Sequence, residues 1–247
     1  MIDYSHRSYK KELLDGDNIP FKDIAENLKE LDFINSYLGG HSITIKGFKK
    51  LAGNKETISV CEIGCGGGDN INAIYDYCKR NNIVASFEGV DINPDCIAFA
   101  RKHSRVKNVN FISSDYKKVT FKEGKPDIIF SSLFCHHFNE NELLEMFQWM
   151  KQNAVVGFFI NDLHRHPLAY NFIKAATKLF SKSYLVKNDA PLSVLRGFKE
   201  NEWKAIFKSA GIDKYFIEWK WAFRYLIIVG SLSENKNQSY ITHKNFK

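Results

Sequence analysis

The sequence predicts an α/β fold, a doubly wound and mostly parallel sheet with helices on both faces. Three observations predict it. From about residue 57, apolar runs alternate with turns and helical stretches, which is typical of parallel strands joined by crossover helices. A glycine-rich turn at 64–68 joins one of these runs to a helix. Acidic residues also follow three successive runs, at the edge where open parallel sheets bind ligands.

Length and composition favour one soluble domain. A chain of 247 residues, 44% hydrophobic and 26% charged, can bury a full core. No apolar run approaches the roughly 20 residues that a membrane-spanning helix needs. The first 17 residues have neither the apolar centre nor the cleavage site of a secretory signal. We therefore expect a cytoplasmic protein without a membrane span.

The cysteines and the charge exclude some classes of function. Five cysteines form an odd set without C-x-x-C spacing, which argues against a disulfide framework and against a zinc site. The net charge of +7 raises the question of nucleic acid. The lysines are scattered in doublets rather than gathered in one arm among aromatic residues, which is typical of a solvated surface. We expect reduced core thiols and no nucleic-acid partner.

The alternating part of the chain begins after a predicted helical cap over residues 1–52, in which one helix ends at Gly39-Gly40. Pro94 fits the first turn of a helix, and Asn139 or Asn141 fits the N-cap of another. The first five strands are predicted at 57–63, 86–92, 108–113, 126–134 and 154–162, and the helices between them at 70–80, 93–103 and 139–152.

The order of elements changes after the fifth strand. An insert at 163–198 contains a predicted helix at 167–182 and a loop or lid at 187–198. A further helix ends at Gly211. The main domain therefore spans 53–232 with a lid, followed by a polar, frayed tail at 233–247 whose Asn237 sequon should be idle. Two antiparallel strands are predicted at 214–223 and 224–231, which brings the sheet to seven strands.

The glycine turn selects its ligand by charge. A phosphate-binding P-loop would need Lys-Ser or Lys-Thr, and the chain has neither. A dinucleotide turn would need glycine where Asp69 stands, and that acid would face the pyrophosphate. S-adenosylmethionine carries no phosphate, and its ammonium and carboxylate suit the acidic Glu62 beside close backbone approach. The glycines that permit this approach are Gly64, Gly66 and Gly68.

Two later acids agree with an adenosine ligand. Asp91 ends the second strand, where a carboxylate can accept both ribose hydroxyls, and Ile92 would then lie against the adenine. Asp115 ends the third strand and can accept from the adenine amino group, with Tyr116 beside it. The alternative for each acid alone is a turn or capping residue.

The E-x-G-x-G-x-G signature at 62–68, together with these acids, resembles class I S-adenosylmethionine-dependent methyltransferases over residues 55–230. The resemblance implies their Rossmann-like methyltransferase fold, with S-adenosylmethionine as cofactor and the last strand antiparallel. It implies further cofactor contacts at Cys65, Ser131, Ser132 and Leu133.

His136 and His137 resemble the paired histidines of small-molecule methyltransferases that act on quinol, polyketide or lipid-like acceptors. Imidazole is suited to deprotonating a phenol near neutral pH, so both are candidate catalytic residues, with His137 as the base. The alternative is that one caps a helix and the other packs. Amino-directed nucleic-acid enzymes carry a Pro-Pro-aromatic motif here, which this chain lacks, and no proline precedes Cys135 as in carbon-directed RNA enzymes.

A second polar cluster follows the fifth strand, where loops form acceptor pockets. Its alternatives are helix capping, salt bridging or, less favoured, metal binding; overall we expect no metal. In the cap, Tyr4, Arg7 and Lys11 could reach the cofactor or the acceptor. The candidate acceptor-binding residues are Asp162, His164, Arg165, His166 and Arg196.

The sequence therefore predicts methyl transfer to a small hydroxylated acceptor, aromatic and polyketide- or quinol-like, most simply on oxygen. An RNA or protein methyltransferase is one alternative, supported by the basic surface alone. A cofactor-binding protein without turnover is another. The acceptor's identity, nitrogen or carbon as the methylated atom, and the oligomeric state stay open.

Overall fold

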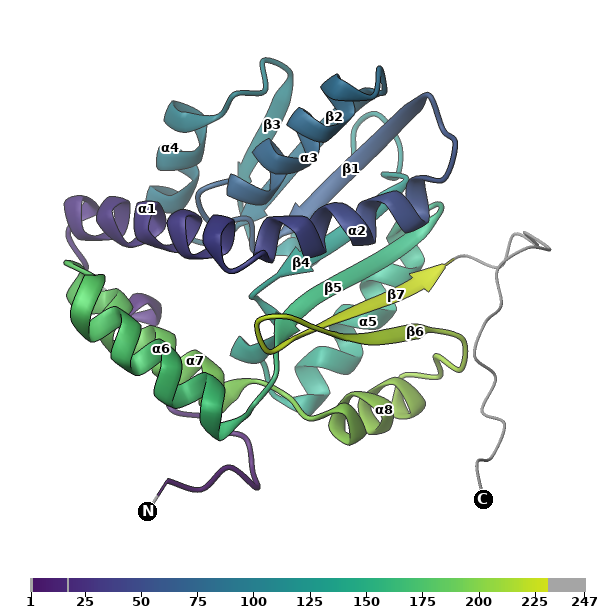
Figure 1. The fold of residues 1–247 in the computed structure, drawn as a ribbon. Coiled ribbons are helices and arrows are strands. Elements are labelled where there is room, and N and C mark those ends of the chain that lie inside the picture. Colours follow the sequence, from purple (N-terminus) through teal and green to yellow (C-terminus); the bar gives the residue numbers. More distant parts are fainter. Residues whose placement is uncertain (1, 17, 231–247) are drawn as a thin grey trace.

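The computed structural model describes residues 2–16 and 18–230, and the predicted tail at 233–247 with its Asn237 sequon lies outside them. Seven strands form one sheet in the order β3-β2-β1-β4-β5-β7-β6 (Figure 1). This confirms the predicted seven-stranded α/β fold. The strands are β1 (Thr57–Ile63), β2 (Val84–Asp91), β3 (Val109–Ser113), β4 (Ile128–Ser132), β5 (Gly157–Leu163), β6 (Phe216–Lys220) and β7 (Arg224–Gly230).

Strands β1 to β5 are parallel, and the last two strands form the predicted antiparallel hairpin. β7 also pairs antiparallel with β5, with Ile160 opposite Ile227, so that β7 lies inside the sheet and β6 forms its edge. The order reverses between β1 and β4, which is the switch point where doubly wound sheets bind their ligands.

Helices cover both faces of the sheet (Figure 1). Alternate strand residues divide between two cores, as in Val60 and its neighbour Cys61, because successive side chains point to opposite faces. This double burial explains the nearly continuous apolar runs of the parallel strands. One face is covered by α2 (Gly40–Ala52), α3 (Asp69–Arg80) and α4 (Pro94–His103), and the other by α5 (Glu140–Asn153) and α8 (Glu200–Ser209).

Three of the predicted helix ends are confirmed. Asn93 caps α4, with Pro94 as its first residue. Asn139, rather than Asn141, caps α5, and Glu142 completes the capping box. Gly211 follows α8 at φ +66°, the left-handed conformation that ends many helices.

The predicted helical character is wrong for most of residues 2–16 and 18–20. Over the described part of residues 2–20, the one helical piece is the 3₁₀ turn η1 (Leu13–Asp15). The helical cap starts with α1 (Phe21–Tyr37), and Gly39, at φ +77°, turns the chain into α2. The earlier residues lack a helical apolar period, and their place is set by distant partners, such as the carbonyl of Leu195, which accepts from the amide of Ser8 at 3.0 Å.

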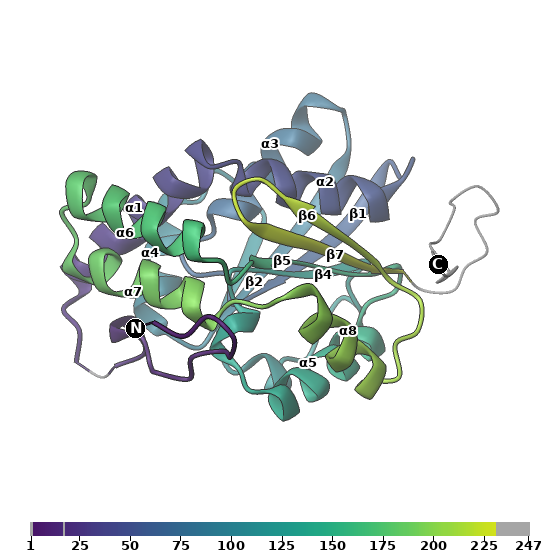
Figure 2. The same cartoon turned by 60° about the horizontal axis from the view of Figure 1, so that its bottom comes forward.

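The predicted loop at 187–198 is also wrong. Most of it belongs to the helix α7 (Tyr184–Arg196), which contains Pro191. Proline removes one helical hydrogen bond, but the helix is stabilised by burial and by Ser183, which caps it. It lies beside α6 (Pro167–Phe180), and the N-terminal segment passes next to it (Figure 2). The buried apolar residues of α7 are Leu185, Val186, Leu192 and Val194.

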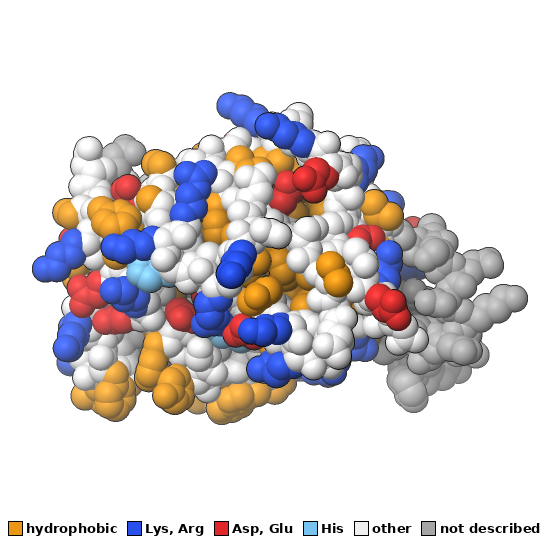
Figure 3. Space-filling model, turned by 90° about the horizontal axis from the view of Figure 1, so that it is seen from above, with side chains coloured by type: hydrophobic (Ala, Val, Ile, Leu, Met, Phe, Trp, Pro, Cys, Tyr) orange, Lys and Arg blue, Asp and Glu red, His pale blue; other side chains and the backbone are white. Residues whose placement is uncertain are grey.

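The burial of the cysteines and the spread of charged side chains over the surface are as the composition predicts. All five cysteines are buried and unpaired with one another. On the face seen in Figure 3, Lys and Arg side chains are spread out, with acidic side chains among them. Among the described helices, none has both the length and the apolar character of a membrane span.

Candidate active site

A cavity of about 1260 Å³ lies where the parallel strands end. The glycine turn and the loops after β2, β3 and β4 line one part of it, and α1, α6, α7 and the N-terminal segment line the rest. Single-ligand pockets usually measure about 300–1,000 Å³. One cavity therefore has room for a nucleoside-sized cofactor and an acceptor together.

The glycine turn adopts backbone conformations that other residues resist. Gly64, Gly66 and Gly68 have φ values of +66°, +48° and +74°. A Cβ at Gly64 would also lie 2.1 Å from the ring of Phe134, which packs directly on the turn. Cys65 lines the cavity between these glycines. The turn thus presents bare backbone to the cavity, as the spacing predicts.

Glu62 is buried behind this turn, with 1% of its surface exposed. Neither carboxylate oxygen has a hydrogen-bond partner among residues 2–16 and 18–230. Burial raises the pKa of Glu62 well above its usual range, and the nearby carboxylates of Asp69 and Asp91 raise it further. A buried, unpartnered acid at this strand end fits a neighbouring positive group of a ligand.

Arg224, at the start of β7, contributes a buried guanidinium to the same cavity. Its Nη2 donates to Asn35 Oδ1 at 2.8 Å, whereas Nη1 has no partner within the described ranges. A guanidinium with an unused N–H is the side chain best shaped to bind a carboxylate. The sequence analysis missed Arg224, although a charged residue at the head of the apolar run 225–230 was a signal.

Asp91 supports the turn from the next strand. Its carboxylate accepts from the backbone amides of Gly66 and Asn93, both at 2.9 Å. Burial raises its pKa, while these two hydrogen bonds oppose the rise. Ile92, 74% exposed, lines the cavity beside it. The acid thus lies where the sequence places a ribose ligand, and it also shapes the turn.

The third acid and the loop after β4 complete this half of the cavity. Asp115 caps the 3₁₀ turn η2 (Tyr116–Lys118), accepting from the Lys117 amide at 3.0 Å, and both Asp115 and Tyr116 line the cavity. Ser132 and Leu133 line it as well. Leu133 has φ +53°, a strained conformation that is concentrated at functional sites. Ser131 does not line the cavity, because its hydroxyl lies 3.4 Å from Cys135 Sγ in the core.

The paired histidines follow on η3 (Cys135–His137), and both line the cavity. His136 is 3% exposed, with Nδ1 2.8 Å from Asp162 Oδ1 and Nε2 3.5 Å from Glu12 Oε1. Burial lowers the pKa of His136, but the carboxylates of Asp162 and Glu12 raise it more, to about 9. His136 therefore ties β5 and the N-terminal segment together.

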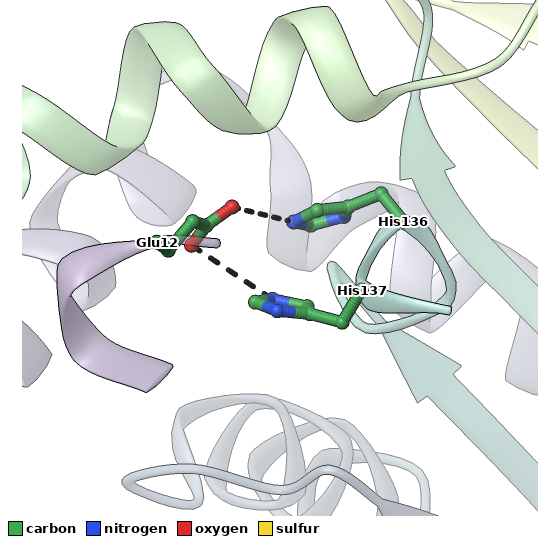
Figure 4. A group of neighbouring side chains, drawn as sticks. All are labelled: Glu12, His136 and His137. Carbon is green, nitrogen blue, oxygen red and sulfur yellow. Dashed lines mark ion pairs between the residues drawn. The ribbon is translucent and has the colours of Figure 1, made fainter. Parts of the chain in front are cut away.

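His137 is the more open of the two, with 23% of its side chain exposed. Its Nδ1 lies 3.2 Å from Asp15 Oδ1 and its Nε2 lies 3.9 Å from Glu12 Oε2. Figure 4 shows both imidazoles directed toward Glu12. Burial raises the pKa of Asp15, but the hydrogen bond and charge of His137 lower it more, to about 2. Glu12 thus faces both rings and Asp15 faces His137, and no sequence pattern marks either carboxylate.

Four of the predicted acceptor-binding residues, at the end of β5 and just after it, contact other parts of the chain rather than the cavity. Asp162, His164, Arg165 and His166 do not line the cavity. The carboxylate of Asp162 contacts the imidazole of His136 instead. His166 caps α6 by accepting from the Leu168 amide at 3.2 Å, which confirms the capping alternative. His164 accepts from Trp219 Nε1 at 3.2 Å, and burial lowers its pKa to about 4.

The two arginines of the prediction hold the N-terminal segment. Arg165, 1% exposed, donates to the carbonyls of Tyr4, Ser5 and Gly197 and forms an ion pair with Glu202. Arg196 lines the cavity, but it donates to backbone carbonyls of residues 10 and 136 and pairs with Asp15 at 3.3 Å.

The candidate residues of the N-terminal cap, Tyr4, Arg7 and Lys11, lie in different surroundings. Arg7 is buried and donates to the carbonyls of Arg196, His136 and Phe138. Tyr4 packs edge-on against Tyr170. Lys11 lines the cavity. Of the three, Lys11 is thus the one that faces the space where a ligand would bind.

Comparison with known proteins places this cavity in context. Residues 60–157 match the family profile of a methyltransferase domain, a range that contains the glycine turn, Asp91, Asp115 and both histidines. A search of curated proteins gives no match.

Solved structures share the fold. The plantazolicin methyltransferase BpumL, in complex with SAH, is 19% identical with a TM-score of 0.57, covering 80% of this chain and 72% of its own. A SAM-dependent methyltransferase from Aquifex aeolicus is 18% identical with a TM-score of 0.59, covering 83% of this chain and 97% of its own. At these identities the likeness establishes the architecture.

Proposed function

We infer that this chain is a class I S-adenosylmethionine-dependent methyltransferase, and we propose that it methylates an oxygen atom of a small hydroxylated, aromatic acceptor. The observation that carries the proposal is the position of His137. Its imidazole is partly exposed in the same cavity as the glycine turn, so a cofactor and an acceptor can meet beside it.

The residues present fit S-adenosylmethionine. Asp91 would accept the ribose hydroxyls, Asp115 the adenine amino group, and the unused N–H of Arg224 would bind the amino-acid carboxylate. The unpartnered carboxyl group of Glu62, buried behind the turn, would accept a hydrogen bond from the positively charged end. The cofactor, when bound, supplies an electrophilic methyl group on a sulfonium.

The protein's part is to orient the acceptor and to receive its proton. A bound acceptor oxygen must approach the methyl carbon to about 3 Å, and holding it there provides much of the acceleration. Asp15 engages His137 Nδ1, which would leave Nε2 to accept the proton of an acceptor hydroxyl. An apolar wall favours an aromatic ring and excludes water. It includes Leu133, Phe134, Phe138, Phe172, Ile173 and Val186.

The proposed binding of S-adenosylmethionine is tested by the Asp91→Ala variant. We expect the affinity for S-adenosylmethionine to fall about 100-fold, since hydrogen bonds to a charged group contribute about 1.5–3 kcal/mol each. Isothermal titration calorimetry measures the change. Asp76→Ala is the matched control, because this carboxylate pairs with Arg105 on the surface outside the cavity. Equal affinity in the Asp91 variant and the wild type would contradict the assignment.

The acceptor half is tested with a panel of phenols, hydroquinones, aromatic amines and carbon nucleophiles. We expect methylated product from phenols or hydroquinones, with mass spectrometry showing one added methyl group and NMR placing it on oxygen. Methylation on nitrogen or carbon would refute the oxygen assignment. Tight cofactor binding with no product from any acceptor would favour a binding protein without turnover.

A further inference from the structure

We propose that Glu12, His136 and His137 form a three-ligand site for a divalent transition cation of the Zn²⁺ class, open on one side to the acceptor cavity. One ligand atom from each residue lies within 4.8 Å of the other two. All three side chains line the cavity, and both imidazole rings are directed at the carboxylate (Figure 4). Two histidines and one carboxylate form a recurring ligand set of catalytic zinc sites.

The separations are close to those that a cation requires. Zn²⁺ binds nitrogen and oxygen at about 2.0–2.1 Å, so two ligand atoms at a tetrahedral angle lie about 3.3 Å apart. His136 Nε2 lies 3.5 Å from one oxygen of Glu12, and His137 Nε2 lies 3.9 Å from the other. Both pairs exceed this separation by less than 1 Å, and the three ligand atoms lie within 4.8 Å of one another, so side-chain rotations would be needed to close the set around a cation.

The outer contacts are an independent observation that points to the same ligand. Each imidazole has its other nitrogen beside a carboxylate, Asp162 at 2.8 Å and Asp15 at 3.2 Å. This carboxylate–histidine arrangement orients the ring and directs its Nε2 lone pair toward a metal. Ser193 Oγ donates to Glu12 Oε1 at 2.6 Å and holds the third ligand. Every ligand therefore has its own orienting contact.

The chemistry of the set selects the cation. Imidazole suits Zn²⁺, Cu²⁺, Fe²⁺ and Ni²⁺, whereas Mg²⁺ and Ca²⁺ prefer oxygen donors. Three carboxylates gather here, those of Glu12, Asp15 and Asp162, and the guanidinium that pairs with one of them is Arg196. With both imidazoles in the neutral form that binds a metal, the remaining negative charge favours a divalent cation.

The cation site extends the proposed function, and its role in catalysis rests on that function. A cation with an open position toward the cavity can bind the acceptor hydroxyl and lower its pKa. In the cation-loaded protein, His137 would serve as a ligand, and the cation would replace the free imidazole by lowering the pKa of that hydroxyl enough for it to lose its proton to solvent. Cation binding itself does not depend on which acceptor the enzyme uses.

The experiment is a Zn²⁺ titration of the full, metal-stripped chain, followed by calorimetry without cofactor or acceptor. We expect one Zn²⁺ per chain in the wild type and a loss of about 100-fold or more in affinity in His137→Ala and Glu12→Gln. Asp162→Asn should lose about 10- to 100-fold, as outer contacts of metal-bound histidines do. His103→Ala, which removes an imidazole of α4 outside the cavity, should bind like the wild type, and excess Mg²⁺ should not compete.

Circular dichroism identifies variants that keep the fold, and the partly exposed His137 makes its variant the decisive one. Equal Zn²⁺ affinity in wild type and folded His137→Ala or Glu12→Gln overturns the site. The methylation assay separates the two proposals, because O-methylated product without Zn²⁺ binding refutes the cation alone. Zn²⁺ binding without product from any acceptor refutes the proposed function alone.

Discussion

The His137→Ala variant should turn over its acceptor about 10²- to 10⁴-fold more slowly than the wild type, the range typical of a lost general base. Its affinity for S-adenosylmethionine should not change, because the ring contacts Glu12 and Asp15 rather than the glycine turn. Steady-state kinetics at saturating cofactor, combined with calorimetry, measure the two quantities separately.

Two further measurements sharpen this result. Imidazole added to His137→Ala in the metal-stripped enzyme should restore part of the rate, because a free base can enter the space left by the ring. His103→Ala, the matched histidine on α4, should keep the wild-type rate, since its ring stacks on Phe99 outside the cavity. Full activity in His137→Ala would remove the base from the mechanism.

The Arg165→Met variant should lose about 3 kcal/mol or more of unfolding free energy, which lowers the melting temperature by about 10 °C in a protein of this size. The substitution keeps the length of the buried side chain but removes all its donors. Glu202 loses its ion-pair partner, and the carbonyls of Tyr4, Ser5 and Gly197 lose theirs. Differential scanning calorimetry gives the shift.

The matched control for this variant is Arg105→Met. Arg105 pairs with Asp76 at 2.7 Å on the surface, where ion pairs contribute about 0–1 kcal/mol. Loosening of residues 4 and 5 should also loosen Glu12 and Asp15, so acceptor turnover should fall more than cofactor affinity. A melting temperature equal to that of Arg105→Met would show that Arg165 does not hold the N-terminal segment.

The sequence alone determined the sheet, the glycine turn and the order of the acids at the strand ends. These features depend on neighbours a few residues apart, such as alternating apolar runs, Asn139 before its helix and glycine at the left-handed positions Gly64 and Gly68. The acids Glu62, Asp91 and Asp115 follow from the same local logic, because the ends of adjacent parallel strands must meet at one edge.

The tertiary structure alone decided what surrounds the histidines. Glu12 meets His136 across 124 positions of the chain, and nothing within residues 2–16 marks it as a partner. Likewise Arg165 reads as a ligand-binding residue in a polar cluster, but its donors are used by Tyr4 and Glu202. Charged side chains carry no local signal of their partners, since a buried charge is stabilised by whatever opposite group the fold brings near it.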